Sequence, residues 1–256
     1  MDKIKIFSKS QFSLLWWSGT ISSFGDWATL FGSVALASYL GTEAGNSELT
    51  AIVPLIARIV PALLSSFAGL IADRYDKKII MIFCDVIRMI FVMFLFFADN
   101  LYSIFLINFL SEIFSLIRQP SREAVVPEIV NKENLVKANS LFAIGTYATL
   151  PVASLALGVV SDWNSLELIN ETGNGWSGSI IFLFDTFTFI ASAILLYFLK
   201  NQNKNTLNKK PDVSFKNFKD GLDYFFKTKD IRNISFSISF CLIGAGTLFI
   251  LGHTFL

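Results

Sequence analysis

Charged residues are scarce in this chain, and their scarcity excludes most soluble folds. Only 16% of the 256 residues are Asp, Glu, Lys or Arg, whereas a soluble domain usually carries about a quarter. Hydrophobic residues make up 53% of the chain, and phenylalanine alone supplies 27 positions. Too few charges remain to cover a surface in water, so we expect lipid to cover much of the molecule.

Cysteine and histidine are also nearly absent. The two cysteines, Cys84 and Cys241, lie in apolar runs, and His253 is the single histidine. This supply argues against a disulfide framework and offers no set of metal ligands, so we expect no metal and no cofactor. The sequence shows no basic stripe for nucleic acid, no phosphate-binding P-loop and no His-Glu-x-x-His zinc motif. We therefore expect a protein that is not an enzyme.

Long hydrophobic runs, in contrast, are abundant. A membrane-spanning helix needs about 20 mostly apolar residues. Six segments meet this requirement and a seventh begins near the end: residues 11–39, 49–72, 79–98, 101–117, 136–160, 178–199 and 234–256. We predict an all-α membrane protein with a six-helix transmembrane domain at 1–200, a cytoplasmic linker with an amphipathic helix at 201–232, and a truncated seventh helix at 233–256.

The distribution of basic residues predicts the orientation of these helices. With the N-terminus in the cytoplasm, all but two of the 21 Lys and Arg residues fall at the N-terminus or in cytoplasmic connections. This count places Arg118 and Arg122 in a connection at 118–130, while Arg58 and Arg88 lie inside helices. Because cytoplasmic loops are enriched in Lys and Arg, we expect a multi-pass inner-membrane protein with a cytoplasmic N-terminus.

The connection between the second and third predicted helices carries a distinctive pattern. Residues 69–78 read GLIADRYDKK. A glycine there permits close helix approach, and the first aspartate can face the positive end of a helix. The stretch resembles the signature loop of the major facilitator superfamily, with Asp76 in place of the usual Gly. The resemblance implies a gating loop that contains Gly69, Asp73, Arg74, Lys77 and Lys78.

Two other stretches resemble one branch of this superfamily, which contains macrolide-efflux proteins and the enterobactin exporter. They read GTISSFGDW at residues 19–27 and RQPSREAVVPEIV at 118–130. The fifth predicted helix is similar to the helix-bending motif of exporters at Gly145, Pro151 and Gly158. The resemblance implies the N-terminal half of a transporter, built as two inverted three-helix repeats, with the C-terminal half of the same protein missing from this chain.

Charged residues inside the predicted helices are the best site candidates, because they are costly in lipid unless paired or hydrated. Asp26 and Arg58 both lie roughly 20 Å from the inner face, so they can form a pair. The resemblance places the third and sixth helices, the latter with Asp185, outside the transport cavity. We therefore assign substrate or proton coupling to Asp26, Arg58 and Glu112, and a structural charge cluster to Asp85 and Arg88.

The predicted function is ion-coupled export of a small hydrophobic or amphipathic compound, such as a drug or a siderophore-like molecule, by alternating access. The expected partners are this small molecule, protons and the lipid bilayer. A lipid or lysophospholipid flippase of the same superfamily would share every motif above and is the first alternative. A non-transporting membrane interaction protein is the second alternative, if the chain truly ends at residue 256.

Overall fold

The computed structural model describes residues 10–43, 50, 52–62, 75–161 and 179–200, together with 226–229, 232–233 and 236–237. Two compact units divide the chain, Met1–Lys209 and Lys210–Leu256. Every helix named below lies in the first unit. The predicted linker and seventh helix fall almost entirely outside the described residues, so both stay predictions.

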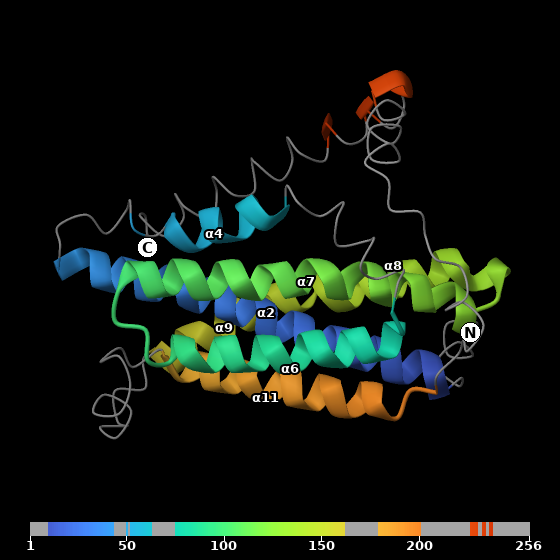
Figure 1. Cartoon of the computed structure of the whole chain (residues 1–256), viewed down its shortest axis with the longest axis horizontal. Coiled ribbons are helices and arrows are strands. Elements are labelled where there is room, and N and C mark those ends of the chain that lie inside the picture. Colours follow the sequence, from blue (N-terminus) through green and yellow to red (C-terminus); the bar gives the residue numbers. More distant parts are fainter. Residues whose placement is uncertain are drawn as a thin grey trace. The chain divides into compact units, whose positions relative to one another are not determined.

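In the described part of the first unit, all regular elements are helices joined by short connections (Figure 1). Its long helices are α2 (Ser10–Glu43), α6 (Lys77–Leu95), α7 (Leu101–Ile129) and α11 (Ile180–Tyr197). Its shorter helices are α4 (Val53–Ala62), α8 (Leu135–Tyr147) and α9 (Thr149–Ser161), with a 3-10 turn at Lys132–Asn134. The all-α prediction is confirmed for the residues that the structure describes.

Three described stretches are long and apolar enough to cross a membrane by length and composition: Leu101–Ile129, Lys132–Val159 and Ile180–Tyr197. α6 is apolar but is not among them, because its 19 residues include four charged side chains, those of Lys77, Lys78, Asp85 and Arg88. α2 carries Ser, Thr and Gly along its length, which lowers its hydropathy. The number of spans predicted from the sequence, six and the start of a seventh, therefore stays a prediction.

The fourth helix is longer than the sequence predicts. The expected connection at 118–130 is wrong, because α7 continues to Ile129 with Pro120 and Pro127 inside it. Proline is tolerated in membrane helices where side chains or neighbouring helices satisfy the freed backbone groups. Arg118, which the charge count placed in a loop, therefore lies on a helix and is only 6% exposed.

The fifth predicted helix is divided at Ala148 into α8 and α9. Pro151 has no N–H, so it cannot donate a helical hydrogen bond to the carbonyl of Tyr147. The preceding carbonyl, that of Thr146, accepts hydrogen bonds from Trp27 Nε1 at 2.9 Å and from Thr149 Oγ1 at 2.7 Å. A side chain of α2 thus stabilises the break.

The helices enclose two apolar cores. α6 packs against both α7 and α11, while α2 packs against α11, α8 and α9 (Figure 1). One core includes Met81 of α6, and the other includes Val92 of the same helix. Asp85 and Arg88 lie between these two positions, so a polar layer separates the cores. The candidate site lies in this layer.

Candidate functional site

A closed ion pair forms one part of the polar layer. Asp85 Oδ1 of α6 lies 2.6 Å from Arg118 Nε of α7. Ser192 of α11 donates a hydrogen bond to Asp85 Oδ2 at 2.7 Å and accepts one from Arg118 Nη2 at 3.1 Å. Asp85 is 0% exposed and Arg118 is 6% exposed. The two charges cancel inside the protein, and together with Ser192 they connect three helices.

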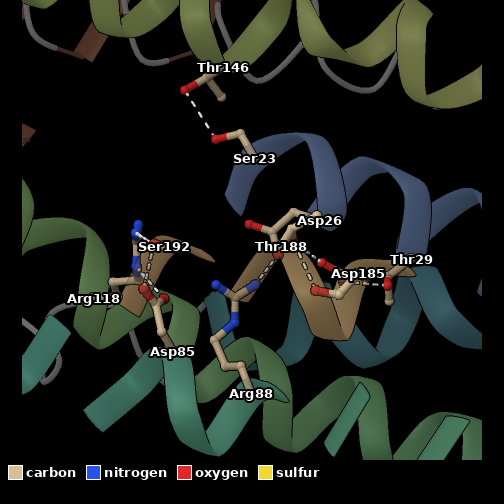
Figure 2. Close-up of polar contacts among 10 residues, drawn as sticks. All are labelled: Ser23, Asp26, Thr29, Asp85, Arg88, Arg118, Thr146, Asp185, Thr188 and Ser192. Atoms are coloured by element: carbon tan, nitrogen blue, oxygen red, sulfur yellow. Dashed lines mark hydrogen bonds and ion pairs between the residues drawn. The ribbon is translucent and has the colours of Figure 1, made fainter. Parts of the chain in front are cut away.

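An open ion pair forms the second part of the layer, beside the first (Figure 2). Arg88 Nη2 of α6 pairs with Asp26 Oδ1 of α2. The Arg88 side chain is 5% exposed, whereas that of Asp26 is 28% exposed. The guanidinium carbon of Arg88 lies 4.5 Å from the ring centroid of Phe189, which adds a cation–π contact. The sequence allowed an Asp26–Arg58 pair, but the structure pairs Asp26 with Arg88.

Asp185 of α11 lies next to the open ion pair (Figure 2). Thr29 of α2 donates a hydrogen bond to Asp185 Oδ2 at 2.5 Å, and Thr188 donates one to Oδ1 at 2.7 Å. Gly25 makes room for this carboxylate, because a Cβ at that position would collide with Asp185 Oδ1. The absence of a side chain at Gly25 therefore lets α2 and α11 approach each other closely.

Two half-buried charges complete the group. Glu112 lies on α7 and Arg58 on α4, two helices that pack against each other. Glu112 interacts electrostatically with Arg58, Arg88 and Asp26. Among the described residues, the buried Nε of Arg58 has no hydrogen-bond partner. We call Asp26, Arg58 and Glu112 the half-buried charge set, since each retains partial exposure while lying among apolar helices.

A metal centre is not supported by these side chains. The described residues contain no group of three or more His, Cys, Asp or Glu arranged to hold a metal ion. Asp26 and Asp85 instead pair with arginines, and Asp185 accepts hydrogen bonds from two threonines. The arrangement is chemically suited to binding charged groups and protons.

Sequence comparison decides the family. The family model for the Major Facilitator Superfamily matches residues 15–256 of the chain. The chain belongs to this superfamily. It is a multi-pass membrane protein of a transporter family, and not an enzyme.

Curated relatives match part of this chain in sequence. The chain is 27% identical over 161 residues to the lysophospholipid transporter LplT of Escherichia coli strain SE11, which is 63% of this chain and 39% of that protein. It is 30% identical over 143 residues to LplT of Pectobacterium carotovorum, covering 56% and 34% of the two chains. LplT of Cronobacter sakazakii is 26% identical over 160 residues, covering 62% and 39%. The matched region thus spans about two fifths or less of each relative.

These relatives correct the branch that the sequence motifs implied. The stretches at 19–27 and 118–130 pointed to macrolide-efflux proteins and the enterobactin exporter, but the relatives are named as lysophospholipid transporters. The superfamily was therefore predicted correctly, whereas the branch is not supported. In this chain the first stretch supplies the helix contact at Gly25, and the second extends α7.

The superfamily's signature loop is described only at its end. Gly69, Asp73 and Arg74 lie outside the described residues. Asp76, where the family usually has Gly, caps α6 by accepting hydrogen bonds from the backbone N–H groups of Lys78 at 2.9 Å and Ile79 at 3.2 Å. The substitution of Gly by Asp at this turn thus supplies a helix N-cap.

The two lysines of the loop contact neighbouring helices of the same unit. Lys77 Nζ pairs with Glu128 near the end of α7. Lys78 Nζ donates a hydrogen bond to the carbonyl of Tyr197 at the end of α11, at 2.7 Å. A positive charge at a helix C-terminus is favourable because it faces the negative end of the helix dipole. Both lysines therefore connect the start of α6 to the ends of neighbouring helices. Their gating role stays a prediction.

The bending residues lie in unlike surroundings. A Cβ at Gly145 would collide with Thr20 Oγ1 of α2, so this glycine marks close packing of α8 on α2. A Cβ at Gly158 would meet nothing within 4 Å. Pro151 accompanies the division between α8 and α9 described above. The structure thus shows close packing at Gly145 and a helix division near Pro151, and the helix-bending role of Gly145, Pro151 and Gly158 stays a prediction.

Sequence reasoning missed part of the polar layer. It grouped Asp85 with Arg88, but the structure gives each a separate partner on another helix. Arg118 was counted as a loop residue, and Ser192 was not considered. If residues 118–129 had been predicted as helical, Arg118 would have been placed at the height of Asp85. Pro120 and Pro127 made this stretch resemble a loop, so the pair was missed.

Proposed function

We propose that the full-length protein moves a lysophospholipid across the inner membrane by alternating access. The observation that carries this proposal is the similarity to LplT proteins, which extends over 161 residues of this chain. The sequence named a lipid or lysophospholipid flippase as the alternative to drug export, and the relatives favour that alternative. Because the matched region spans only 39% of the Escherichia coli relative, substrate and activity are proposed for the whole protein.

The half-buried charge set fits the headgroup of such a lipid. A lysophospholipid carries a phosphate and a single acyl chain, so its carrier must offer charged groups beside an apolar path. Arg58 supplies a guanidinium whose Nε has no hydrogen-bond partner among the described residues, which suits a phosphate. Glu112 and Asp26 supply partly exposed carboxylates for a cationic headgroup or a coupling proton.

The apolar faces of the helices fit the acyl chain and the surrounding bilayer. α6 exposes Phe83 and Phe94, and α11 exposes Phe187 and Ile194. Large apolar side chains on the outside of a helical unit are stable in lipid rather than in water. With the basic residues on the cytoplasmic side, we place the N-terminus in the cytoplasm and the two halves around a site near the middle of the membrane.

Export of a small amphipathic compound is the second candidate. The division of the fifth predicted helix at Ala148, with Gly145 and Pro151 on either side, resembles the bending motif of exporters. A drug or siderophore-like substrate would use the same charge set and the same proton coupling. The two functions differ in the molecule that moves, and one assay with both substrates separates them.

Transport in proteoliposomes tests the proposal. The full-length protein is reconstituted in vesicles, and the translocation of fluorescent lysophospholipid is compared with that of fluorescent diacyl phospholipid and of a cationic drug. We expect protein-dependent movement of the lysophospholipid, competed by unlabelled lysophospholipid and not by the drug. Movement of the drug alone would overturn the proposal in favour of the second candidate, and movement of neither would overturn both.

A further inference from the structure

Asp185 is a buried carboxylate to which the sequence assigned no function. It is 0% exposed and accepts hydrogen bonds from Thr29 and Thr188. In the described part of the chain, no Lys or Arg forms an ion pair with it. An ionised carboxylate without a cation of its own is costly inside a membrane protein, so this residue requires an explanation.

The charged groups around Asp185 come from the helices that pack on α11. α2 contributes Asp26, α6 contributes Arg88, and the described residues of α9 include no titratable side chain. Asp85 also lies on α6, but Arg118 matches its charge within the closed ion pair. What remains around Asp185 is one guanidinium for two carboxylates.

This imbalance can be removed by one proton. Two carboxylates that share a site cannot both ionise freely, because each disfavours the charged form of the other. We propose that Asp26 and Asp185 hold one exchangeable proton between them, and that Arg88 pairs with whichever carboxylate is ionised. In one state Asp26 is ionised and paired with Arg88 while Asp185 carries the proton. In the other state the proton is on Asp26 and Arg88 is paired with Asp185.

The positions of Asp26, Arg88 and Asp185 fit such an exchange. Figure 2 shows Asp26, Arg88 and Asp185 as one group, apart from Asp85, Arg118 and Ser192. Arg88 interacts electrostatically with both Asp26 and Asp185, and its guanidinium lies against the ring of Phe189, one helical turn after Asp185. Asp26, with its side chain 28% exposed, is the point at which the proton enters.

Exchange of the proton changes which helices are tied together. Arg88 connects α6 to α2 when it pairs with Asp26, and connects α6 to α11 when it pairs with Asp185. Thr29 and Thr188 stabilise the ionised form of Asp185 in the second state. The proton thus acts as a switch between two sets of helix contacts, which is the kind of change that ion-coupled alternating access needs.

Infrared difference spectroscopy of the full-length protein in lipid tests this pair without any transported substrate. A protonated carboxylic acid has a carbonyl stretching band that disappears when the group ionises or is replaced by an amide. We expect a titrating band that is lost in both Asp26→Asn and Asp185→Asn, because one carboxylate beside Arg88 no longer needs a proton. Persistence of the band in either variant would overturn the proposal.

A milder pair of variants keeps the test decisive where Asp185→Asn fails to fold. Thr29→Val removes a hydrogen bond to Asp185 without changing any charge, and is expected to move the midpoint of the band upward by about one pH unit. The matched control is Ser23→Ala on the same helix, whose hydroxyl contacts Thr146 rather than Asp185, and no shift is expected there. An unmoved midpoint in Thr29→Val contradicts the proposal. A titrating band in a protein that moves no lysophospholipid would refute only the proposed substrate.

Discussion

The closed and the open ion pairs lie on the same face of α6, three residues apart, yet they have unlike surroundings. Asp85 and Arg118 are buried, matched in charge and bridged by Ser192. Asp26 and Arg88 share their surroundings with Asp185 and Glu112, and Asp26 is partly exposed. A buried ion pair whose charges balance can hold helices together. A partly exposed group with more carboxylates than arginines can in addition bind a proton or a headgroup. Position along a helix therefore says less about function than charge balance does.

Breaking the closed ion pair should have the largest effect on stability. Arg118→Met leaves Asp85 buried without a cation, which should lower the free energy of unfolding by about 3–5 kcal/mol. The measurement is the thermal unfolding midpoint of the full-length protein in detergent. Asp85→Leu combined with Arg118→Met removes both charges and should recover most of the loss. A single variant as stable as the wild type would show that the pair is not structural.

Closing the space at Gly25 should have the next largest effect. In Gly25→Ala the new Cβ collides with Asp185 and Thr188, so α2 and α11 must separate or shift. Overpacking of this kind costs about 1–3 kcal/mol, which a lower thermal midpoint would reveal. Gly158→Ala is the matched control, because its Cβ meets nothing within 4 Å. Equal effects of the two substitutions would contradict the close approach at Gly25.

The cap of α6 should contribute less, and it provides a baseline outside the polar layer. Asp76→Ala removes the acceptor for two backbone N–H groups and should cost about 1 kcal/mol. Asp76→Gly restores the residue that the family usually has. It should lower the free energy of unfolding by only about 0.3 kcal/mol, since glycine is itself an acceptable cap. The same thermal measurement distinguishes the two, and a larger loss in the glycine variant would argue against a capping role.

Much of the fold follows from the sequence for clear physical reasons. Long apolar runs predicted helices, and the starts of α6 and α7 agree with the predicted segments to within two residues. The end of α7 was predicted too early, because Pro120 and the charges around it resemble a loop. In a membrane helix such residues can be satisfied by other helices, and Arg118 is satisfied by α6 and α11.

The sequence identified most of the charged residues of the site, but it did not predict which of them form ion pairs. Asp26, Arg58, Asp85, Arg88 and Glu112 were identified because a charge within an apolar run is conspicuous. Depth along the membrane suggested which charges share a height, but it carries no information on rotation about the helix axis. Depth thus favoured a pair between Asp26 and Arg58, whereas Asp26 pairs with Arg88. The use of Gly25 as space for Asp185 is also invisible without the contact between helices.

The most direct test of the functional assignment compares two glutamates of α7. Glu112 belongs to the half-buried charge set, whereas Glu123 is exposed and accepts a hydrogen bond from Gln119 at 3.1 Å. Glu112→Gln and Glu123→Gln each remove one negative charge from the same helix, and lysophospholipid transport and thermal stability are measured for both in the full-length protein. We predict that Glu112→Gln lowers the initial rate about tenfold with an unchanged unfolding midpoint, because it removes a charged contact to headgroup or proton, while Glu123→Gln transports normally. Equal transport by the two variants would contradict the account.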